Sequence, residues 1–309
     1  MTSDHLRLQA ELGSLTTEAF RPELAEIDQL PTLDIARLMN GEDAGVAAAV
    51  AARLPEIAAA IDAIAARMAR GGRLIYAGAG TAGRLGVLDA SECPPTFNTE
   101  PGQVVGLIAG GREAMVTSVE GAEDSKELAR ADLDALKVAA DDSVVGISAS
   151  GRTPYAVGAV EHARGLGALT VGLACNEHSA LAAAAEHGIE VVVGPELLTG
   201  STRLKAGTAQ KLVLNMLSTI TMIRLGKTYG NLMVDVRASN DKLRARSRRI
   251  VALATGASDA EIERALTESG GEVKNAILAI LADVDGPTAA RLLEESGGHL
   301  RAALAVAGG

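Results

Sequence analysis

The sequence predicts an α/β fold: a doubly wound, five-stranded parallel sheet, with a helical segment before it and a small helical domain after it. Two observations predict the sheet. Short runs of Val, Ile, Leu and Ala recur between residues 73 and 193, as expected of parallel strands buried on both faces. Amphipathic helical patterns separate these runs, which is typical of βαβ units. A third observation marks the end of the sheet, because the last ~60 residues carry only short helical patterns.

These patterns define the elements in chain order. The expected early helices are Thr32–Asn40 and a long alanine-rich Gly45–Arg70, which Pro55 splits or kinks. The expected strands are Arg73–Ala77, Val104–Ala109, Ser143–Ser148, Ala168–Ala174 and Ile189–Val193. The expected helices between and after them are Gly83–Glu92, Ala122–Leu136, Pro154–Gly165, Ser179–His187 and Lys205–Leu225.

Three parts follow along the chain: an N-terminal segment at 1–45, a ligand-binding catalytic domain at 46–245 and a small helical domain at 246–309. The last part holds a weak internal repeat, LTESGG at Leu266–Gly271 and LEESGG at Leu293–Gly298. Glycines are typical just after helix C-termini, so each copy is expected to end a helix.

Composition and charge exclude several classes of protein. The net charge is −10, and the only basic patch is the short Arg244–Arg249, which argues against general nucleic-acid binding. Cys93 and Cys175 are far apart in sequence and give neither a metal-ligand spacing nor a disulfide framework. We therefore expect a reducing cytoplasm. Neither a signal-peptide pattern nor a membrane-spanning apolar run is visible, so no membrane partner is expected.

A glycine-rich turn, Gly78–Gly83, follows the first expected strand and matches G-x-G-x-x-G. Such a strand–turn–helix unit typically holds a phosphate or a sugar, with Gly80 and Thr81 as candidate contacts. A dinucleotide site is an alternative, but it requires an acidic residue at the end of the second strand, where the sequence has Gly110–Arg112. A tight turn without any ligand is the second alternative.

A second turn, Ser148–Pro154, follows the third strand and brings several hydroxyls to a helix N-terminus. Backbone N–H groups and the helix dipole favour an anion there, so Ser148, Ser150, Gly151 and Thr153 are candidate phosphate contacts. The alternative is helix capping, but a single capping residue explains one hydroxyl and not three.

A third hydroxyl-rich turn, Thr199–Thr208, opens the long helix after the sheet. Ser201 and Lys205 are candidate substrate contacts in this turn, and Glu196 just upstream is a candidate acceptor for sugar hydroxyls. A capped helix start with basic surface residues is the alternative.

Two carboxylates are candidates for proton transfer. Glu92 precedes Pro94 and Pro95, which we expect to end its helix. The negative end of the helix dipole would then favour the protonated carboxyl, which suits a general acid. Glu123 is a candidate base, although acidic residues at a helix start are also common for stability alone.

Five stretches together resemble a known family. They are GAGTAGRLGVLDASECPPT (Gly78–Thr96), EGAEDS (Glu120–Ser125), SASGRTPY (Ser148–Tyr155), TGSTRLKAGTAQKLVLNMLST (Thr199–Thr219) and GNLMVDV (Gly230–Val236). Their turns resemble the sugar isomerase (SIS) domain, and the whole chain resembles the bacterial N-acetylmuramic acid 6-phosphate etherases. The pairing of ASECPPT with EGAEDS is far more specific than a glycine motif.

The resemblance implies a carbon–oxygen lyase of peptidoglycan recycling, a cytoplasmic homodimer with an SIS domain and without a metal or redox cofactor. Such enzymes cleave the D-lactyl ether of N-acetylmuramic acid 6-phosphate by elimination and then hydration, giving N-acetylglucosamine 6-phosphate and D-lactate. The resemblance assigns the acid to Glu92, the base to Glu123, and the 6-phosphate site to the Ser148–Thr153 turn.

The sequence departs from the family pattern at two places. Ala82 stands where serine is common, so one hydrogen bond of roughly 1 kcal/mol is expected to be missing. Phe20–Pro22 follow Thr17-Glu18 where an Arg-Asn pair is common, which puts a substrate contact from this element in doubt. Two rival functions use the same fold: an aldose–ketose isomerase, which has no use for an acid at a C3 ether, and a non-enzymatic sugar-phosphate-sensing regulator.

Overall fold

The computed structural model describes residue 13 and residues 15–236 and 241–308. The described residues form two compact units: those up to 91 together with 102–218, and 92–101 together with those from 219 onward. The second unit therefore begins before the boundary expected at residue 245. The first part of the expected N-terminal segment lies outside the described residues.

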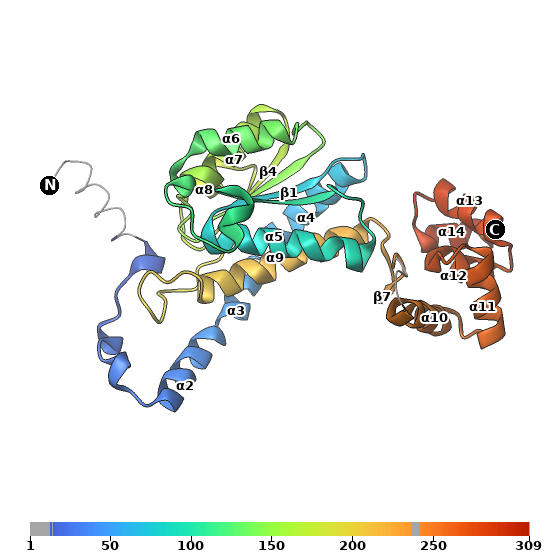
Figure 1. Ribbon diagram of the computed structural model, residues 1–309, viewed down its shortest axis with the longest axis horizontal. Coiled ribbons are helices and arrows are strands. Elements are labelled where there is room, and N and C mark those ends of the chain that lie inside the picture. The colour runs from blue at the N-terminus through green and yellow to red at the C-terminus, as the bar shows by residue number, and fades with distance from the viewer. Residues whose placement is uncertain (1–12, 14, 237–240, 309) are drawn as a thin grey trace. The chain divides into compact units, whose positions relative to one another are not determined.

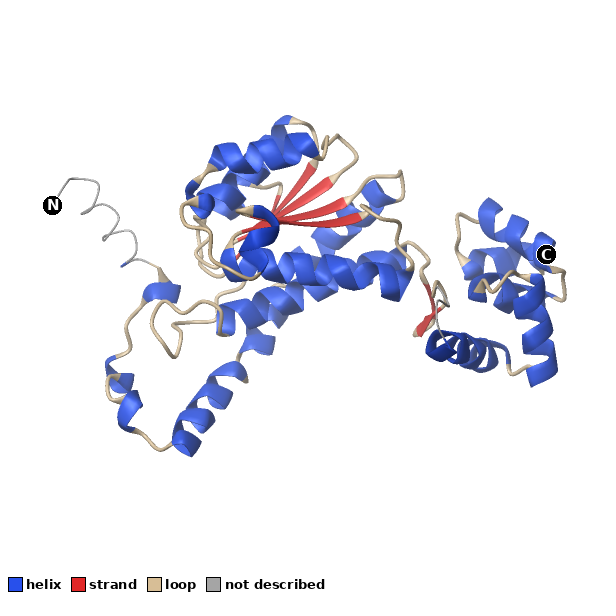
Figure 2. Cartoon of the chain, viewed as in Figure 1, coloured by secondary structure: helices blue, strands red, loops and turns tan. Residues whose placement is uncertain are grey.

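A five-stranded parallel sheet forms the centre of the first unit (Figures 1 and 2). Its strands are β1 (Leu74–Gly78), β2 (Val104–Ile108), β3 (Ser143–Ile147), β4 (Leu169–Ala174) and β5 (His187–Glu190), in the spatial order β2-β1-β3-β4-β5. The prediction of a five-stranded parallel sheet is confirmed. The prediction was wrong in detail at the edge, where β5 begins at His187, a residue expected to end a helix.

Helices cover both faces of this sheet (Figure 1). One face carries α6 (Lys126–Ala135), α7 (Pro154–Gly165) and α8 (Ala180–Ala184). The other carries α4 (Leu54–Met68), α5 (Gly80–Phe97) and α9 (Lys205–Arg224). Every residue of the inner strands β1, β3 and β4 is buried, which explains why these runs are mostly apolar and carry no charged residue.

The strand order places the carboxyl ends of β1 and β3 side by side. In the register, Gly78 pairs with Ile108 of β2 and Ile147 of β3, so the turns after all three strands leave the sheet at one level. From β1 the chain passes to β2 at one edge of the sheet, and from β3 it passes to β4 and β5 toward the other edge. The boundary between β1 and β3 is therefore the topological switch point, where open α/β sheets bind ligands.

Helix α5 corrects one expectation. Pro94 and Pro95 lie inside it, and the helix continues to Phe97. The carbonyl of Pro94 still accepts a hydrogen bond from Asn98 N at 2.9 Å, and Asn98 adopts a left-handed φ of 50° that ends the helix. Glu92 therefore lies more than one turn before the helix end, beyond the range in which the dipole is strong.

The segment before the sheet is helical. Three 3₁₀ turns (Thr16–Glu18, Pro22–Leu24 and Ile27–Gln29) precede α2 (Thr32–Asp43) and α3 (Val46–Ala51). Pro55 lies in the first turn of α4, so the expected long helix is split there. No single helix of the described residues is long and apolar enough to cross a membrane. One pair, Thr32–Ala51 with Leu54–Met68, passes that test only when joined across a 60° bend.

The second unit has its own core. A hairpin of β6 (Thr228–Tyr229) and β7 (Leu232–Met233) precedes helices α10 (Asp241–Thr255), α11 (Asp259–Glu268), α12 (Val273–Ala282), α13 (Gly286–Glu295) and α14 (Leu300–Ala307). The repeat ends two of them as expected: Gly271 N donates to Leu266 O at 2.7 Å after α11, and Gly298 N donates to Leu293 O at 2.8 Å after α13.

Candidate active site

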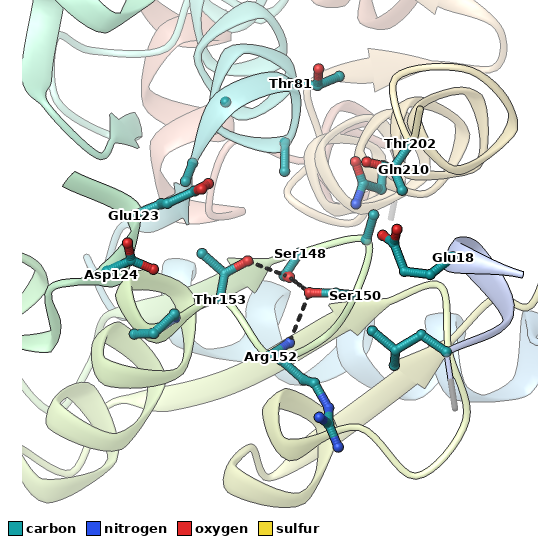
Figure 3. Close-up of a pocket in the computed structure, with 16 residues that line it drawn as sticks. Glu18, Thr81, Glu123, Asp124, Ser148, Ser150, Arg152, Thr153, Thr202 and Gln210 are labelled. Atoms are coloured by element: carbon teal, nitrogen blue, oxygen red, sulfur yellow. Dashed lines mark hydrogen bonds between the residues drawn. The ribbon is translucent and has the colours of Figure 1, made fainter. Parts of the chain in front are cut away.

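A cavity of about 710 Å³ opens at the carboxyl ends of β1 and β3 (Figure 3). It is contained in the first unit. Its polar lining consists of Glu18, Thr81, Glu123, Asp124, Ser148, Ser150, Arg152, Thr153, Thr202 and Gln210. These residues come from five separate stretches of the chain, and three of the stretches are the turns that the sequence analysis selected.

The glycine-rich turn after β1 supplies Gly80, Thr81 and Ala82 to the cavity wall. Two other glycines of the motif serve packing. A β-carbon on Gly83 would lie 2.6 Å from Gly78 O, and one on Gly78 would lie 2.9 Å from Gly83 N. Gly78 and Gly83 therefore let the first turn of α5 pack directly on the end of β1. Of the motif, Ala79 to Ala82 line the cavity.

The turn after β3 gathers three hydroxyls into one cradle (Figure 3). Ser148 Oγ lies 2.8 Å from Thr153 Oγ1 and 3.2 Å from Ser150 Oγ. The same serines accept hydrogen bonds from Gly151 N at 3.0 Å and Arg152 N at 3.2 Å. Thr153 is the N-cap of α7 but makes no capping hydrogen bond with its side chain, so capping does not explain its hydroxyl.

Gly151 shapes this cradle without lining the cavity. It is buried, its φ is 70°, and a β-carbon there would lie 2.3 Å from Ser179 Cβ. Any larger residue would push the turn away from α8. The role of Gly151 is therefore to fix the path of the backbone beneath the hydroxyls.

Glu123 and Glu18 stand on opposite sides of the cavity (Figure 3). Glu123 lies in a short 3₁₀ turn, Ala122–Asp124, that follows the loop after β2, and it is exposed. The structure therefore brings this predicted base next to the hydroxyl cradle and the glycine-rich turn. Glu18 comes from the altered N-terminal element, and its presence here was not expected from that element's divergence.

Buried hydrogen bonds hold Glu18 in place. The neighbouring Thr17 is fully buried, and Asn176 binds it twice: Thr17 N donates to Asn176 Oδ1 at 3.4 Å, and Asn176 Nδ2 donates to Thr17 Oγ1 at 3.0 Å. Asn176 Nδ2 also donates to Ala149 O at 3.0 Å, in the cradle turn. One side chain thus joins the N-terminal element to the candidate phosphate site. Its place two residues after β4 was the only sequence signal for Asn176.

Helix α9 contributes Gln210, which sequence reasoning missed. The residue is 1% exposed, and its Nε2 has no hydrogen-bond partner among the described residues. A buried amide donor without an acceptor is costly, so its position in the cavity wall suits a bound oxygen atom. Thr202 lines the cavity from the turn before α9, whereas the predicted contact Ser201 does not.

Two predicted contacts have internal partners instead. Glu196 is fully buried, and its two oxygens accept hydrogen bonds from Lys205 N and Ala206 N, each at 3.0 Å, at the start of α9. Lys205 is 5% exposed and pairs with Glu42, which also binds Arg21 at 2.7 Å. The ion pairs lower the pKa of Glu42, with the Lys205 contact as the largest cause. Neither Glu196 nor Lys205 lines the cavity.

Glu92 is not part of this cavity. It is exposed on α5, twelve residues beyond Gly80. At a rise of 1.5 Å per residue, that separation is about 18 Å along the helix, far more than a glutamate side chain spans. The proposed base therefore lines the cavity, whereas the proposed acid does not. In the described part of the chain, no group of three or more His, Cys, Asp or Glu side chains is arranged to hold a metal ion.

Two family models match this chain. Residues 123–220 match the SIS domain, and residues 56–164 match the N-terminal SIS domain of glucokinase regulatory protein. Among solved structures, a phosphoheptose isomerase from Francisella tularensis is 21% identical with a TM-score of 0.49, over 63% of this chain and all of that one.

Relatives of known name match nearly the whole chain. The N-acetylmuramic acid 6-phosphate etherase of Streptomyces coelicolor is 86% identical over 306 residues, covering 99% of this chain and 98% of that protein. The proteins of the same name from Streptomyces avermitilis and Rubrobacter xylanophilus are 84% and 61% identical, over 99% and 96% of this chain and 98% of each relative. This chain therefore belongs to the N-acetylmuramic acid 6-phosphate etherase family.

Proposed function

We propose that this protein cleaves the D-lactyl ether of N-acetylmuramic acid 6-phosphate and releases N-acetylglucosamine 6-phosphate and D-lactate. The observation that carries the proposal is one cavity that combines a hydroxyl cradle with a facing carboxylate, in a chain 86% identical to a protein named for this activity. The reaction needs both features, because the substrate is a phosphorylated sugar and its chemistry begins with loss of a proton.

The cradle of Ser148, Ser150 and Thr153 binds the 6-phosphate. Ser148 Oγ lies within 3.2 Å of the other two hydroxyls at the N-terminus of α7, where free N–H groups and the helix dipole attract an anion. Thr81 and Gly80 contact the sugar chain from the opposite turn, and Gln210 donates a hydrogen bond to a substrate oxygen.

Glu123 is the base of the elimination. It takes the proton from C2 of the open-chain aldehyde, where the adjacent carbonyl acidifies that proton. The C2–H electron pair forms the C2–C3 double bond as the C3–O bond breaks, and the ether oxygen leaves with its electrons. An acid protonates that oxygen, so D-lactate departs. Water then adds its hydroxyl to C3 and a proton to C2, which restores a saturated sugar.

Glu92 is the acid, and a second copy of the chain supplies it. Its exposure and its separation of about 18 Å from Gly80 along α5 keep it from the cavity of its own chain. In a symmetric homodimer each copy presents the same surface, so each cavity receives one Glu92 from its neighbour. We place this dimer in the cytoplasm, where Cys93 and Cys175 remain thiols.

Release of D-lactate tests the function directly. Purified protein is incubated with N-acetylmuramic acid 6-phosphate, and D-lactate dehydrogenase with NAD⁺ records the product. We expect D-lactate in equal amount to N-acetylglucosamine 6-phosphate. Formation of a ketose phosphate without lactate would instead support an isomerase. Saturable binding of the sugar phosphate with no turnover at high protein concentration would support a regulator.

A further inference from the structure

A second, smaller cavity adjoins the first. Its volume is about 230 Å³, and Ala79, Gly80 and Glu123 line both cavities. A water molecule occupies about 30 Å³ of liquid, so the space accommodates a group of roughly seven non-hydrogen atoms. The proposed base therefore stands between the phosphate-binding cavity and a side cavity of small-molecule size.

Arg84 is the cation of this side cavity. It is half-buried in α5, and its Nε donates to Met115 O at 3.1 Å. Among the described residues no carboxylate forms an ion pair with it. Two other partly buried arginines are paired: Arg21 lies 2.7 Å from Glu42, and Arg73 lies 2.6 Å from Asp142. A guanidinium has five donors, so Arg84 retains donors for a planar anion after binding Met115.

We propose that the side cavity is the subsite of the D-lactyl group, and that Arg84 binds the lactyl carboxylate. This inference rests on the proposed function. With the 6-phosphate in the cradle and C2 at Glu123, the substituent on C3 is one bond beyond the reacting carbon. The ether oxygen and its three-carbon acid amount to six non-hydrogen atoms, which matches the space, and the acid carries the charge that Arg84 recognises.

The other polar groups of the side cavity agree with this role. Ser118 adds a hydroxyl that can donate to a carboxylate. Glu120 also lines the cavity, but it is exposed, so solvent screens its repulsion of a bound anion. An isomerase substrate has no acid on C3 and no use for such a subsite. Arg84 thus provides discrimination between a muramic and a glucosamine sugar phosphate.

The competing explanation is structural: Arg84 only anchors the loop after β2 through Met115 O. A pair of substrates separates the two roles. The natural substrate carries the lactyl carboxylate, and its carboxamide analogue has the same shape without the charge. Formation of N-acetylglucosamine 6-phosphate is measured by chromatography for both, because lactamide escapes the lactate dehydrogenase assay.

We expect Arg84→Gln to lower kcat/KM for the natural substrate about 10- to 100-fold, because it removes a charged hydrogen-bond pair. The same substitution should change kcat/KM for the carboxamide less than about threefold. Arg84→Lys keeps the charge and should recover part of the loss. Arg112→Gln, an exposed arginine of the same loop that lines neither cavity, is the matched control and should leave both substrates unaffected.

Equal losses on both substrates, with no recovery in Arg84→Lys, would overturn the subsite and leave Arg84 as a loop anchor. A thermal melt of each variant shows whether it is folded, and the lysine variant decides the question if the glutamine variant unfolds. Wild-type protein that releases no lactate would overturn the proposed function itself. This outcome differs from an active wild type whose Arg84 variants lose the same share of kcat/KM on both substrates.

Discussion

Glu123 differs from the other carboxylates of the main cavity in its position. Glu18 and Asp124 line only that cavity, whereas Glu123 also lines the side cavity. A base for C2 has to lie between the phosphate at one end of the sugar chain and the leaving group on C3. Glu123 is the carboxylate of the described cavity walls that meets both conditions.

Substitution of Glu123 should stop proton abstraction. We expect Glu123→Gln to lower kcat by roughly 10²- to 10⁴-fold, the usual contribution of a general base, and to abolish exchange of the C2 proton with deuterium oxide. Exchange is followed by proton NMR on the sugar phosphate. Glu127→Gln, an exposed glutamate at the start of α6, is the control. Exchange at the wild-type rate in Glu123→Gln would mean that another group is the base.

The individual site residues show what the sequence determines and what it does not. The hydroxyls after β3 were predictable because a turn between a strand and a helix has a fixed place at the sheet edge. Glu196 and Lys205 have the residue types of sugar contacts, yet the fold pairs them with the start of α9 and with Glu42. Lys205 and Glu42 are 163 residues apart, and no local pattern reports such a pairing or the hydrogen bonds that Glu196 makes inside the fold. Gln210 was missed because its place in the cavity wall depends on how α9 packs on the sheet, which no local pattern reports.

At the scale of elements, Asp89 joins α5 to its neighbours. The carboxyl is 6% exposed and accepts hydrogen bonds from Tyr76 of β1 at 2.8 Å, and from Asn215 and Ser218 of α9 at 2.7 and 3.1 Å. Burial raises the pKa of Asp89, against the opposing effect of these three donors. The strand, α5 and α9 thus meet at one titratable group.

This raised pKa predicts how stability depends on pH. Above the ordinary aspartate pKa of about 3.9, the folded protein retains a proton on Asp89 that the unfolded chain has lost. The free energy of unfolding contributed by Asp89 is therefore full below about pH 4 and falls as pH rises through the folded-state pKa, by up to about 1.4 kcal/mol per unit. Asp89→Asn keeps an acceptor for the donors of α9 but removes the titration.

Urea unfolding of wild type and Asp89→Asn in steps from about pH 4 to pH 7 checks this. We expect the variant to gain stability relative to wild type as pH rises across that window. Asp28→Asn, at an exposed aspartate, is the control and should follow the wild-type curve. Parallel curves for wild type and Asp89→Asn would show that Asp89 has the same pKa in the folded and unfolded states.

The elements themselves were predictable where burial dominates. The inner strands lie at the positions expected from their apolar runs, within one residue at each end. The prediction failed at β5 and α5 for physical reasons. His187 and Glu190 occupy an edge strand, where partial exposure tolerates polar residues. Pro94 and Pro95 remove hydrogen bonds from α5 without ending it, and packing of a long helix overrides a local breaker.

At the scale of the whole molecule, the proposed roles of Glu92 and Glu123 predict an active site that two copies of the chain complete together. Both glutamates are exposed, and about 18 Å of helix α5 separates Glu92 from Gly80 in the cavity wall. A twofold dimer would bring Glu92 of one copy to the cavity of the other. A dimer of this kind contains two equivalent sites, each with one glutamate from either copy.

Heterodimers of two inactive variants test this arrangement. Glu92→Gln and Glu123→Gln are co-expressed with different affinity tags, and the mixed dimer is isolated by two successive purifications. If the copies share their sites, one site of the mixed dimer holds both substitutions and the other holds none. The mixed dimer should then show about half the wild-type rate of lactate release, although each homodimer is nearly inactive. If one chain supplied both glutamates, every site would carry one substitution and no activity would return. A wild-type dimer that carries the same two tags sets the reference rate. If no doubly tagged protein is recovered, the proposal that the chain forms a dimer is wrong.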